Sequence, residues 1–235
     1  MGRIFEKRKY KMFARFDKMA KAFTRYGKEI AIAVKLSGPD PNLNPRLRTA
    51  IQNAKGVNMP KDRIDAAIKR ASSKDEKDLQ EVLYEGYAPH GIGILVECAT
   101  DNPTRTVANV RMYFTKAGGS LAASGSVGFL FERKGVFKLA ADNVNSEELE
   151  LELIDYGAED FAVDENEIYV YTSFADFTKM QKTLDEKKLN VDSAEIQYVP
   201  NSSNELTEKQ EEDVLKLIAA IEEDEDVQNV YHNMK

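Results

Sequence analysis

The charge of this chain changes sign near residue 74. Residues 1–74 hold 19 of the 33 lysine and arginine residues but only 6 of the 40 acidic residues, a net charge of +13. Residues 75–235 hold the other 14 and 34, a net charge of −20. Such asymmetry predicts a basic head on an acidic body, with one part contacting nucleic acid or an anionic membrane surface. The alternative is a solvated basic helical face that binds no ligand.

The first 71 residues show helical spacing of apolar side chains. The spacing continues on both sides of Gly27, where we expect a break or bend. After a loop at residues 37–41, Asn44 predicts a helix N-cap with Pro45 at the first helical position. Pro60 predicts the start of a further helix. The cations lie mainly between the apolar stripes, so we expect a small helical core with a positive outer surface.

Beyond a polar linker at residues 72–81 the pattern becomes mixed α/β. We expect a strand at 92–98, a helix at 103–116, strands at 127–132 and 136–139, a helix at 146–155, strands near 160–163 and 167–172, a helix at 174–187, a strand at 194–199, a helix at 207–223 and a strand at 227–231. From residue 136 this is the β-α-β-β-α-β order of the ferredoxin-like arrangement. The last helix and strand have no partner of their own, so we expect them to pack on residues 84–132.

These patterns predict an α+β protein. An N-terminal helical domain is followed by two α/β domains of the ferredoxin-like, split β-α-β type, one inserted in the other. We place the basic helical domain at 1–74, a linker at 75–83, an α/β domain at 84–133 plus 200–235, and the inserted ferredoxin-like domain at 134–199.

Composition excludes several classes of function. A single cysteine, Cys98, excludes an intrachain disulfide framework and fits a reducing compartment, so we expect a cytoplasmic protein. Two histidines are too few for a His-rich metal site, and no Ser–His–Asp or paired-carboxylate constellation can be assigned. We therefore predict no metal, no cofactor and no enzymatic activity. No apolar run approaches the roughly 18–20 residues of a membrane span, so we expect no membrane partner.

Three stretches carry specific motifs. The first is Asn44-Pro45-Arg46-Leu47-Arg48, and the second is Asn58-Met59-Pro60-Lys61-Asp62. The third is Tyr84-Glu85-Gly86-Tyr87-Ala88-Pro89-His90-Gly91, followed by Thr100-Asp101-Asn102. Together with the ending Asp226-Val227-Gln228-Asn229-Val230-Tyr231, they resemble the YebC/PmpR family, which includes mitochondrial translational activators. The chain departs from the family in lacking its initial Gly-His-Ser-Lys-Trp segment and in having Ala122 where the family has glycine.

The resemblance implies a three-part architecture and a non-enzymatic cytoplasmic regulator. The family is described as binding promoter DNA and controlling transcription. Members are also described as ribosome-associated translation factors, including at proline-rich stretches. We therefore predict a DNA-binding transcriptional regulator, with a ribosome-associated translation factor that binds RNA as the alternative.

The predicted nucleic-acid contacts are basic residues of the helical domain: Arg3, Lys7, Arg8, Lys9, Lys11, Arg15, Lys18, Lys21, Arg25, Lys28, Arg46, Arg48, Lys55, Lys61, Arg63, Lys69 and Arg70. Arg46 and Arg48 stand in the first turn of a predicted helix, where unpaired N–H groups and the helix dipole favour phosphate. Lys61 and Arg63 repeat this arrangement after Pro60. The alternative is that Arg46 and Arg48 form structural ion pairs with Asp40, Asp62 or Asp65.

A candidate partner surface consists of Tyr84, Tyr87, Arg105 and Arg111. Either tyrosine is suited to stacking on a base or a partner, and packing within the fold is the open alternative. The two arginines lie six residues apart on one predicted helix and so face different sides. No helix pair shows the short turn of a helix-turn-helix, which weakens the case for base reading.

Overall fold

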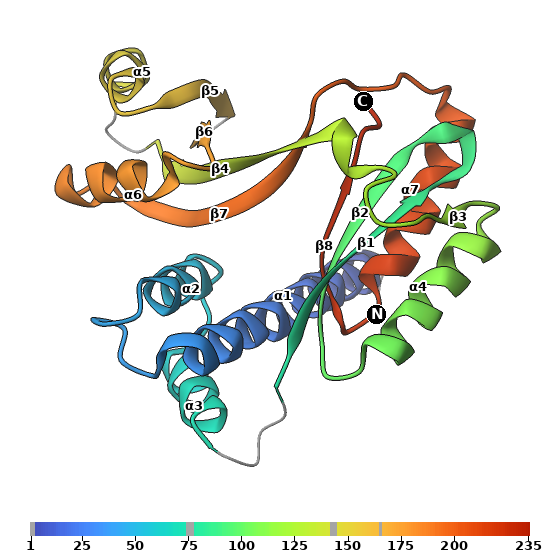
Figure 1. Cartoon of the computed structure of the whole chain (residues 1–235), viewed down its shortest axis with the longest axis horizontal. Helices are drawn as coiled ribbons and strands as arrows, with labels where there is room; N and C mark the ends of the chain where they lie inside the picture. The colour runs from blue at the N-terminus through green and yellow to red at the C-terminus, as the bar shows by residue number, and fades with distance from the viewer. Residues whose placement is uncertain (1–2, 74–77, 142–144, 165) are drawn as a thin grey trace. The chain divides into compact units, whose positions relative to one another are not determined.

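The computed structural model describes residues 3–73, 78–141, 145–164 and 166–235, with the side chains of the first helix described from Met19 onward. The chain divides into two compact units, Met1–Asp78 and Leu79–Lys235 (Figure 1). Among the helices of these described residues, none is long and apolar enough to cross a membrane.

The first unit contains three helices, α1 (Arg3–Ser37), α2 (Pro45–Gly56) and α3 (Lys61–Ala71). Helix α1 runs through Gly27 without interruption, so the expected break is wrong. A single glycine costs a helix only about 1 kcal/mol relative to alanine, and the neighbouring Tyr26 and Ile30 are buried in the core. The buried side chains of this core come from all three helices: Tyr26, Ile30, Ala33, Val34, Leu47, Ala50, Ala54, Met59, Ile64 and Ala71.

Asn44 determines where α2 begins, as predicted. Its side-chain oxygen accepts a hydrogen bond from the Leu47 N–H at 3.0 Å, which caps the helix. Its side-chain nitrogen donates to the carbonyls of Ala33 at 2.7 Å and Gly38 at 2.9 Å. This buried asparagine therefore joins the start of α2 to the end of α1.

A short connection joins α2 to α3. Only residues 57–60 separate the two helices, so the statement that no helix pair has a short turn is wrong. Asn58 adopts a φ of 59°, a left-handed conformation that asparagine tolerates better than most residues. The Met59 N–H donates to the Ala54 carbonyl at 2.9 Å, which closes the turn.

The second unit begins with an antiparallel sheet of β1 (Gln80–Tyr87), β2 (Gly93–Thr100), β3 (Ser120–Leu121) and β8 (Val227–His232), in the order β3-β1-β2-β8. A short 3₁₀ turn, η1 (Pro89–Gly91), joins β1 to β2. Helices α4 (Pro103–Lys116) and α7 (Glu208–Glu222) lie along one face of this sheet (Figure 1). Strand β8 pairs with β2 over Ile94–Cys98, which confirms that the last helix and strand pack on the elements that open this unit.

Two sequence predictions fail around this sheet. Strand β1 was missed because residues 80–83 were assigned to the linker; its alternation of charged and apolar side chains is weak. The strand expected at 127–132 is also wrong. Residues 128–130 form the 3₁₀ turn η2 (Gly128–Leu130), since the backbone N–H groups of Gly125, Val127 and Gly128 bind the Glu85 carboxylate. The extended chain resumes at Phe131, and the strand expected at 136–139 is part of the longer β4.

A second antiparallel sheet follows, with β4 (Phe131–Ala140), β5 (Ala158–Asp164), β6 (Glu167–Ser173) and β7 (Val191–Pro200) in the order β5-β6-β4-β7. With α5 (Ser146–Ile154) and α6 (Phe177–Glu186), this confirms the ferredoxin-like β-α-β-β-α-β unit. Its buried core is formed by Phe137, Leu139, Leu149, Leu153, Ile168, Val170, Met180, Leu184 and Ala194. The proposed domain boundaries stay a prediction.

Candidate nucleic-acid interface

The predicted cations of the first unit differ in exposure. Lys21, Arg46, Arg48, Lys55, Lys61, Arg63, Lys69 and Arg70 are exposed. Arg25 and Lys28 are half-buried. The Arg25 guanidinium lies 4.7 Å from the centre of the Tyr26 ring and 3.9 Å from the Glu29 carboxylate, so this side chain takes part in the fold. The side chains of Arg3, Lys7, Arg8, Lys9, Lys11, Arg15 and Lys18 lie outside those that the structure describes.

The N-terminus of α2 offers little to an anion. Pro45 has no N–H, the Leu47 N–H binds the Asn44 side chain, and the Arg48 N–H binds the Asn44 carbonyl at 3.0 Å. Of the first four backbone N–H groups of α2, one is missing and two already donate hydrogen bonds within the protein. The expected cradle of backbone donors is wrong for these positions, and phosphate binding here has to depend on the arginine side chains.

The N-terminus of α3 carries its own anion. Asp62 lies in the first turn, where a carboxylate interacts favourably with the positive end of the helix dipole. A phosphate at the same end would be repelled by this carboxylate. The sides of both helices, and not their ends, are the surfaces on which phosphate can meet cations without this competition.

Helical geometry separates Arg46 from Arg48. Residues two apart on a helix point in directions roughly 200° apart, so these two arginines do not share a face. Arg48 and Lys55 are seven residues apart and lie on one side of α2, and Arg63 and Arg70 lie on one side of α3. The structure therefore replaces the expected Arg46–Arg48 pair with two pairs that each span two helical turns.

Cations on α2 and α3 are available to a ligand. Within the described residues, these six form no ion pair with a carboxylate: Arg48, Lys55, Lys61, Arg63, Lys69 and Arg70. Arg48 donates only a long 3.4 Å bond to the Pro41 carbonyl, and Asp40 accepts from the backbone and side chain of Asn42 at 2.9 and 3.1 Å. The ion-pair alternative for Arg48 is therefore wrong among these residues.

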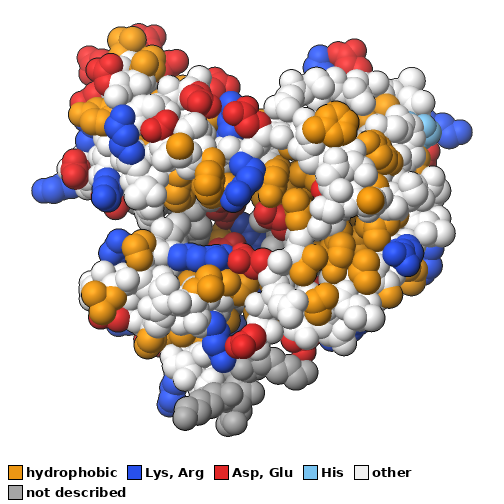
Figure 2. Space-filling model, viewed as in Figure 1, with side chains coloured by type: hydrophobic (Ala, Val, Ile, Leu, Met, Phe, Trp, Pro, Cys, Tyr) orange, Lys and Arg blue, Asp and Glu red, His pale blue; other side chains and the backbone are white. Residues whose placement is uncertain are grey.

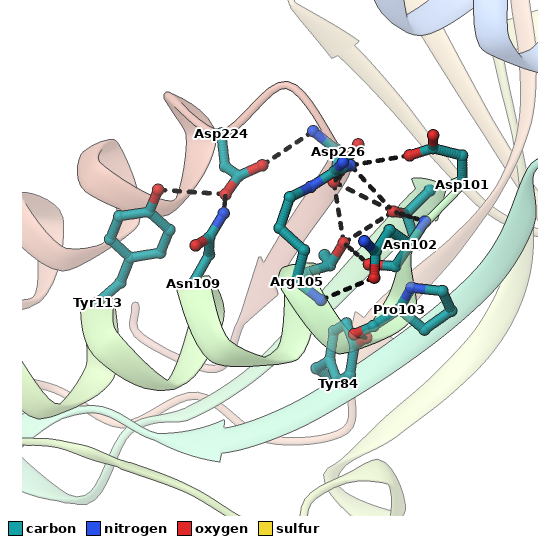
Figure 3. A network of polar contacts seen from close by, with 11 residues as sticks. Tyr84, Asp101, Asn102, Pro103, Arg105, Asn109, Tyr113, Asp224 and Asp226 are labelled. Carbon is teal, nitrogen blue, oxygen red and sulfur yellow. Dashed lines mark hydrogen bonds and ion pairs between the residues drawn. The ribbon is translucent and has the colours of Figure 1, made fainter.

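Arg105 lies in a polar network of the second unit (Figure 3). Its guanidinium contacts Asp226 at 2.7 Å and Asp101 at 3.0 Å, and these hydrogen bonds raise its pKa. The buried Asp226 carboxylate also accepts from Thr106 at 2.9 Å and Thr100 at 3.1 Å. The network joins β2 and α4 to the turn before β8, so Arg105 supports the fold while its side chain stays 47% exposed; its place on a partner surface stays a prediction.

A second carboxylate strengthens the same junction. Asp224 accepts from the Asn109 amide at 3.0 Å and from the Tyr113 hydroxyl at 3.1 Å (Figure 3). Burial and then the Asp224 charge raise the pKa of Tyr113, so its hydroxyl stays protonated and can donate. The predicted helix cap is also present, because the Asn102 side chain accepts from the Arg105 N–H at 3.1 Å.

Tyr84 and Tyr87 do not form one stacking platform. Three residues apart on β1, they point to opposite faces of the sheet. Tyr84 packs with the helix-covered core and donates to the Pro103 carbonyl at 3.2 Å. Tyr87 packs on the other face and donates to the Ser126 carbonyl at 2.8 Å. The structure therefore shows both tyrosines packed within the fold, which was the open alternative. Arg111 is exposed on α4.

Glu85, between these tyrosines, organises a loop. Its buried carboxylate accepts backbone hydrogen bonds from Gly125 at 2.6 Å, Val127 at 2.6 Å and Gly128 at 2.8 Å. Burial alone would raise the pKa of Glu85, but the three N–H donors together outweigh burial and lower it. The motif at residues 84–91 is therefore structural, and Glu85 is held as a carboxylate.

The whole chain matches one protein family. The TACO1/YebC protein N-terminal domain matches residues 3–74, and the TACO1/YebC second and third domain matches residues 79–234. The chain belongs to the TACO1/YebC family. A solved structure of a conserved hypothetical protein from Aquifex aeolicus has a TM-score of 0.83 and 41% identity, covering 92% of this chain and 90% of that one.

Curated family members carry regulatory names. A "probable transcriptional regulatory protein" of Cytophaga hutchinsonii is 59% identical over 234 residues, which is 100% of this chain and 98% of that protein. One of Anaeromyxobacter dehalogenans, with the same description, is 53% identical over 239 residues and covers 100% of both chains. The resemblance drawn from the motifs is confirmed, and it concerns the full length of the chain.

Sequence reasoning missed Asp226 as a structural residue. Thr100 and Arg105 belong to one motif and Asp226 to another in the sequence, although the three meet in one network. The pairing of β8 with β2 brings Asp226 to Thr100 and Arg105, which lie 126 and 121 residues away in the sequence.

Proposed function

We propose that this protein regulates transcription by binding duplex DNA through the exposed cations of α2 and α3. The observation that carries the proposal is the set of six cations, from Arg48 to Arg70, that form no ion pair within the described residues. Each cation that neutralises a phosphate releases condensed counterions, so such a surface binds nucleic acid in a salt-dependent way. We place this activity in the cytoplasm, where a free buried thiol such as Cys98 is usual.

Two further observations favour DNA. The curated relatives are named as probable transcriptional regulatory proteins. The four-residue connection between α2 and α3 also satisfies the turn length of a helix-turn-helix, whose second helix enters the major groove. In this proposal α3 is the helix that approaches the bases, with Arg63 and Arg70 on one side of it.

The competing function is that of a ribosome-associated translation factor. Its ligand would be ribosomal RNA, and exposed cations would bind its phosphates equally well. The two functions differ in sequence discrimination, because a DNA regulator prefers its own site over random DNA by about 10³-fold or more.

The test selects DNA sites from random duplexes with the full-length protein and measures the affinity for the selected site and for random DNA at the same salt concentration. We expect a preference of about 10³-fold or more. Equal affinity for both, with co-sedimentation of the protein with ribosomes at physiological salt, would replace transcription with translation. The Arg63→Gln, Arg70→Gln variant tests the role of α3 in this preference, and it should lose affinity for the selected site.

A further inference from the structure

The most acidic surface of the second unit also exposes apolar side chains. We call it the acidic face, formed by α5 and β5 with their connection, residues 146–164. This stretch has eight acidic residues and no lysine or arginine. All eight carboxylates are exposed, and those of Asp160 and Asp164 lie on the side of β5 that faces away from α5. Glu152 pairs with Lys187 and Glu159 with Lys134, while the other six form no ion pair within the described residues.

Helix α5 is apolar on two sides. Leu149 and Leu153 are buried in the core of the second sheet. Leu151 and Ile154, three residues apart on the opposite side, are 71% and 54% exposed. Figure 2 shows apolar and acidic side chains gathered together over α5 at the upper left. Two large exposed apolar side chains on one face of a nine-residue helix are more than the scattered exposure usual on protein surfaces.

Strand β5 adds an open sheet edge beside this helix. Within the described residues β5 pairs only with β6, so its outer edge has no strand partner. Val163 is 54% exposed and lies opposite the buried Ile168, which places it on the sheet side that α5 covers. An unpaired edge offers backbone donors and acceptors to an added polypeptide segment.

Charge decides which kind of partner fits. Nucleic acid and anionic lipid are repelled by the four carboxylates of α5 and its connection that form no ion pair within the described residues, Glu147, Glu148, Glu150 and Asp155, and so is the same face of a second copy of the chain. A polypeptide segment rich in lysine and arginine is attracted, and its apolar side chains can cover Leu151 and Ile154. We propose that the acidic face binds a cationic, partly apolar segment of a partner protein. This surface is separate from the cations of α2 and α3.

The experiment uses the full-length protein and two synthetic probes. One is an amphipathic peptide of leucine and lysine at helical spacing, and the other is a lysine homopolymer of equal charge. Fluorescence anisotropy gives the dissociation constant of each probe. The variant Leu151→Ser, Ile154→Ser removes the apolar contacts, and Met112→Ser, Leu215→Ser is the matched control, since both of its side chains are also exposed apolar residues on helices.

We expect the amphipathic peptide to bind the wild type about tenfold more tightly than the homopolymer. The Leu151→Ser, Ile154→Ser variant should lose about that factor, and the control should lose none. Equal binding of the two probes, or equal loss in the control, would reduce the effect to nonspecific charge attraction and overturn the proposal.

Sedimentation of the protein alone tests a different occupant. If the wild type self-associates and the Leu151→Ser, Ile154→Ser variant does not, the basic region of a second copy occupies the face, and the proposal of a foreign partner is overturned. Identical sedimentation of both supports it. Neither measurement involves nucleic acid, so their outcome is independent of the proposed DNA binding.

Discussion

Helices α2 and α3 differ from the second unit in the share of their cations that are ion-paired. On α2 and α3, six exposed cations form no ion pair within the described residues. In the second unit, six of the 13 described cations are ion-paired with carboxylates: Arg105, Lys134, Lys138, Lys187, Lys216 and Lys235. The net charge of −7 describes neither unit. Availability of a cation to a phosphate therefore follows from its local partners, and the total charge is a poor guide to it.

The largest effect on stability is expected from removing Glu85. Its carboxylate accepts three backbone hydrogen bonds, and a hydrogen bond to a charged group contributes about 1.5–3 kcal/mol. Glu85→Ala should lower the free energy of unfolding by roughly 3 kcal/mol or more, measured by urea denaturation. The control Glu186→Ala, at an exposed glutamate of α6, should change it by less than about 0.5 kcal/mol. Similar losses in both variants would contradict this account.

A smaller loss is expected from Asp226→Asn. The amide keeps one acceptor but cannot satisfy Arg105, Thr106 and Thr100 together, so the free energy of unfolding should fall by roughly 1–3 kcal/mol. Arg111→Gln, at an exposed arginine of the same α4, should have almost no effect. If Arg111→Gln destabilised the protein as much, the distinction between ion-paired and unpaired cations would fail within one helix.

The stability of the protein in acid should test the charge of Glu85 separately from the packing of its side chain. The folded-state pKa of Glu85 is below its usual 4.5, so its contribution to stability is complete above about pH 4.5 and is lost as pH falls through the folded value. Glu85→Gln should therefore be less stable than the wild type at neutral pH and should lose less stability on acidification. Parallel stability curves for the two proteins in acid would show that the carboxylate charge is unimportant.

Local signals in the sequence predicted much of this structure. The Asn44 cap, the proline-started α2 and the ferredoxin-like order from β4 to β7 follow from neighbouring residues. Predictions failed where distant contacts decide conformation. Glu85 binds the N–H groups of Val127 and Gly128, at the start of the strand expected at 127–132, and packing on α2 and α3 carries α1 through Gly27.

The candidate site was predicted in composition and not in geometry. The basic region was recognised from its charge, but the sequence grouped Arg46 with Arg48, which point to different sides of α2. It also did not predict the ion pair of Arg105 with Asp226, because that pair requires strands far apart in sequence to meet. Knowledge of which cations have partners needs the fold.

The most direct test of the account compares two quadruple variants of the full-length protein with equal net charge. One changes Arg48, Lys55, Arg63 and Arg70 to Gln. The other changes Lys116, Lys182, Lys188 and Lys209 to Gln. These four lysines are exposed cations of the second unit. The free energy of unfolding of both variants should differ from that of the wild type by less than about 0.5 kcal/mol per substitution, because the side chains are exposed.

Affinity for random duplex DNA is then measured against salt concentration. The slope of log affinity against log salt should shrink by up to about 3.6 in the first variant, since each lost phosphate contact removes about 0.9, and should hardly change in the second. Equal shrinkage in both variants would mean that net charge alone governs binding, and would contradict a phosphate-binding surface on α2 and α3.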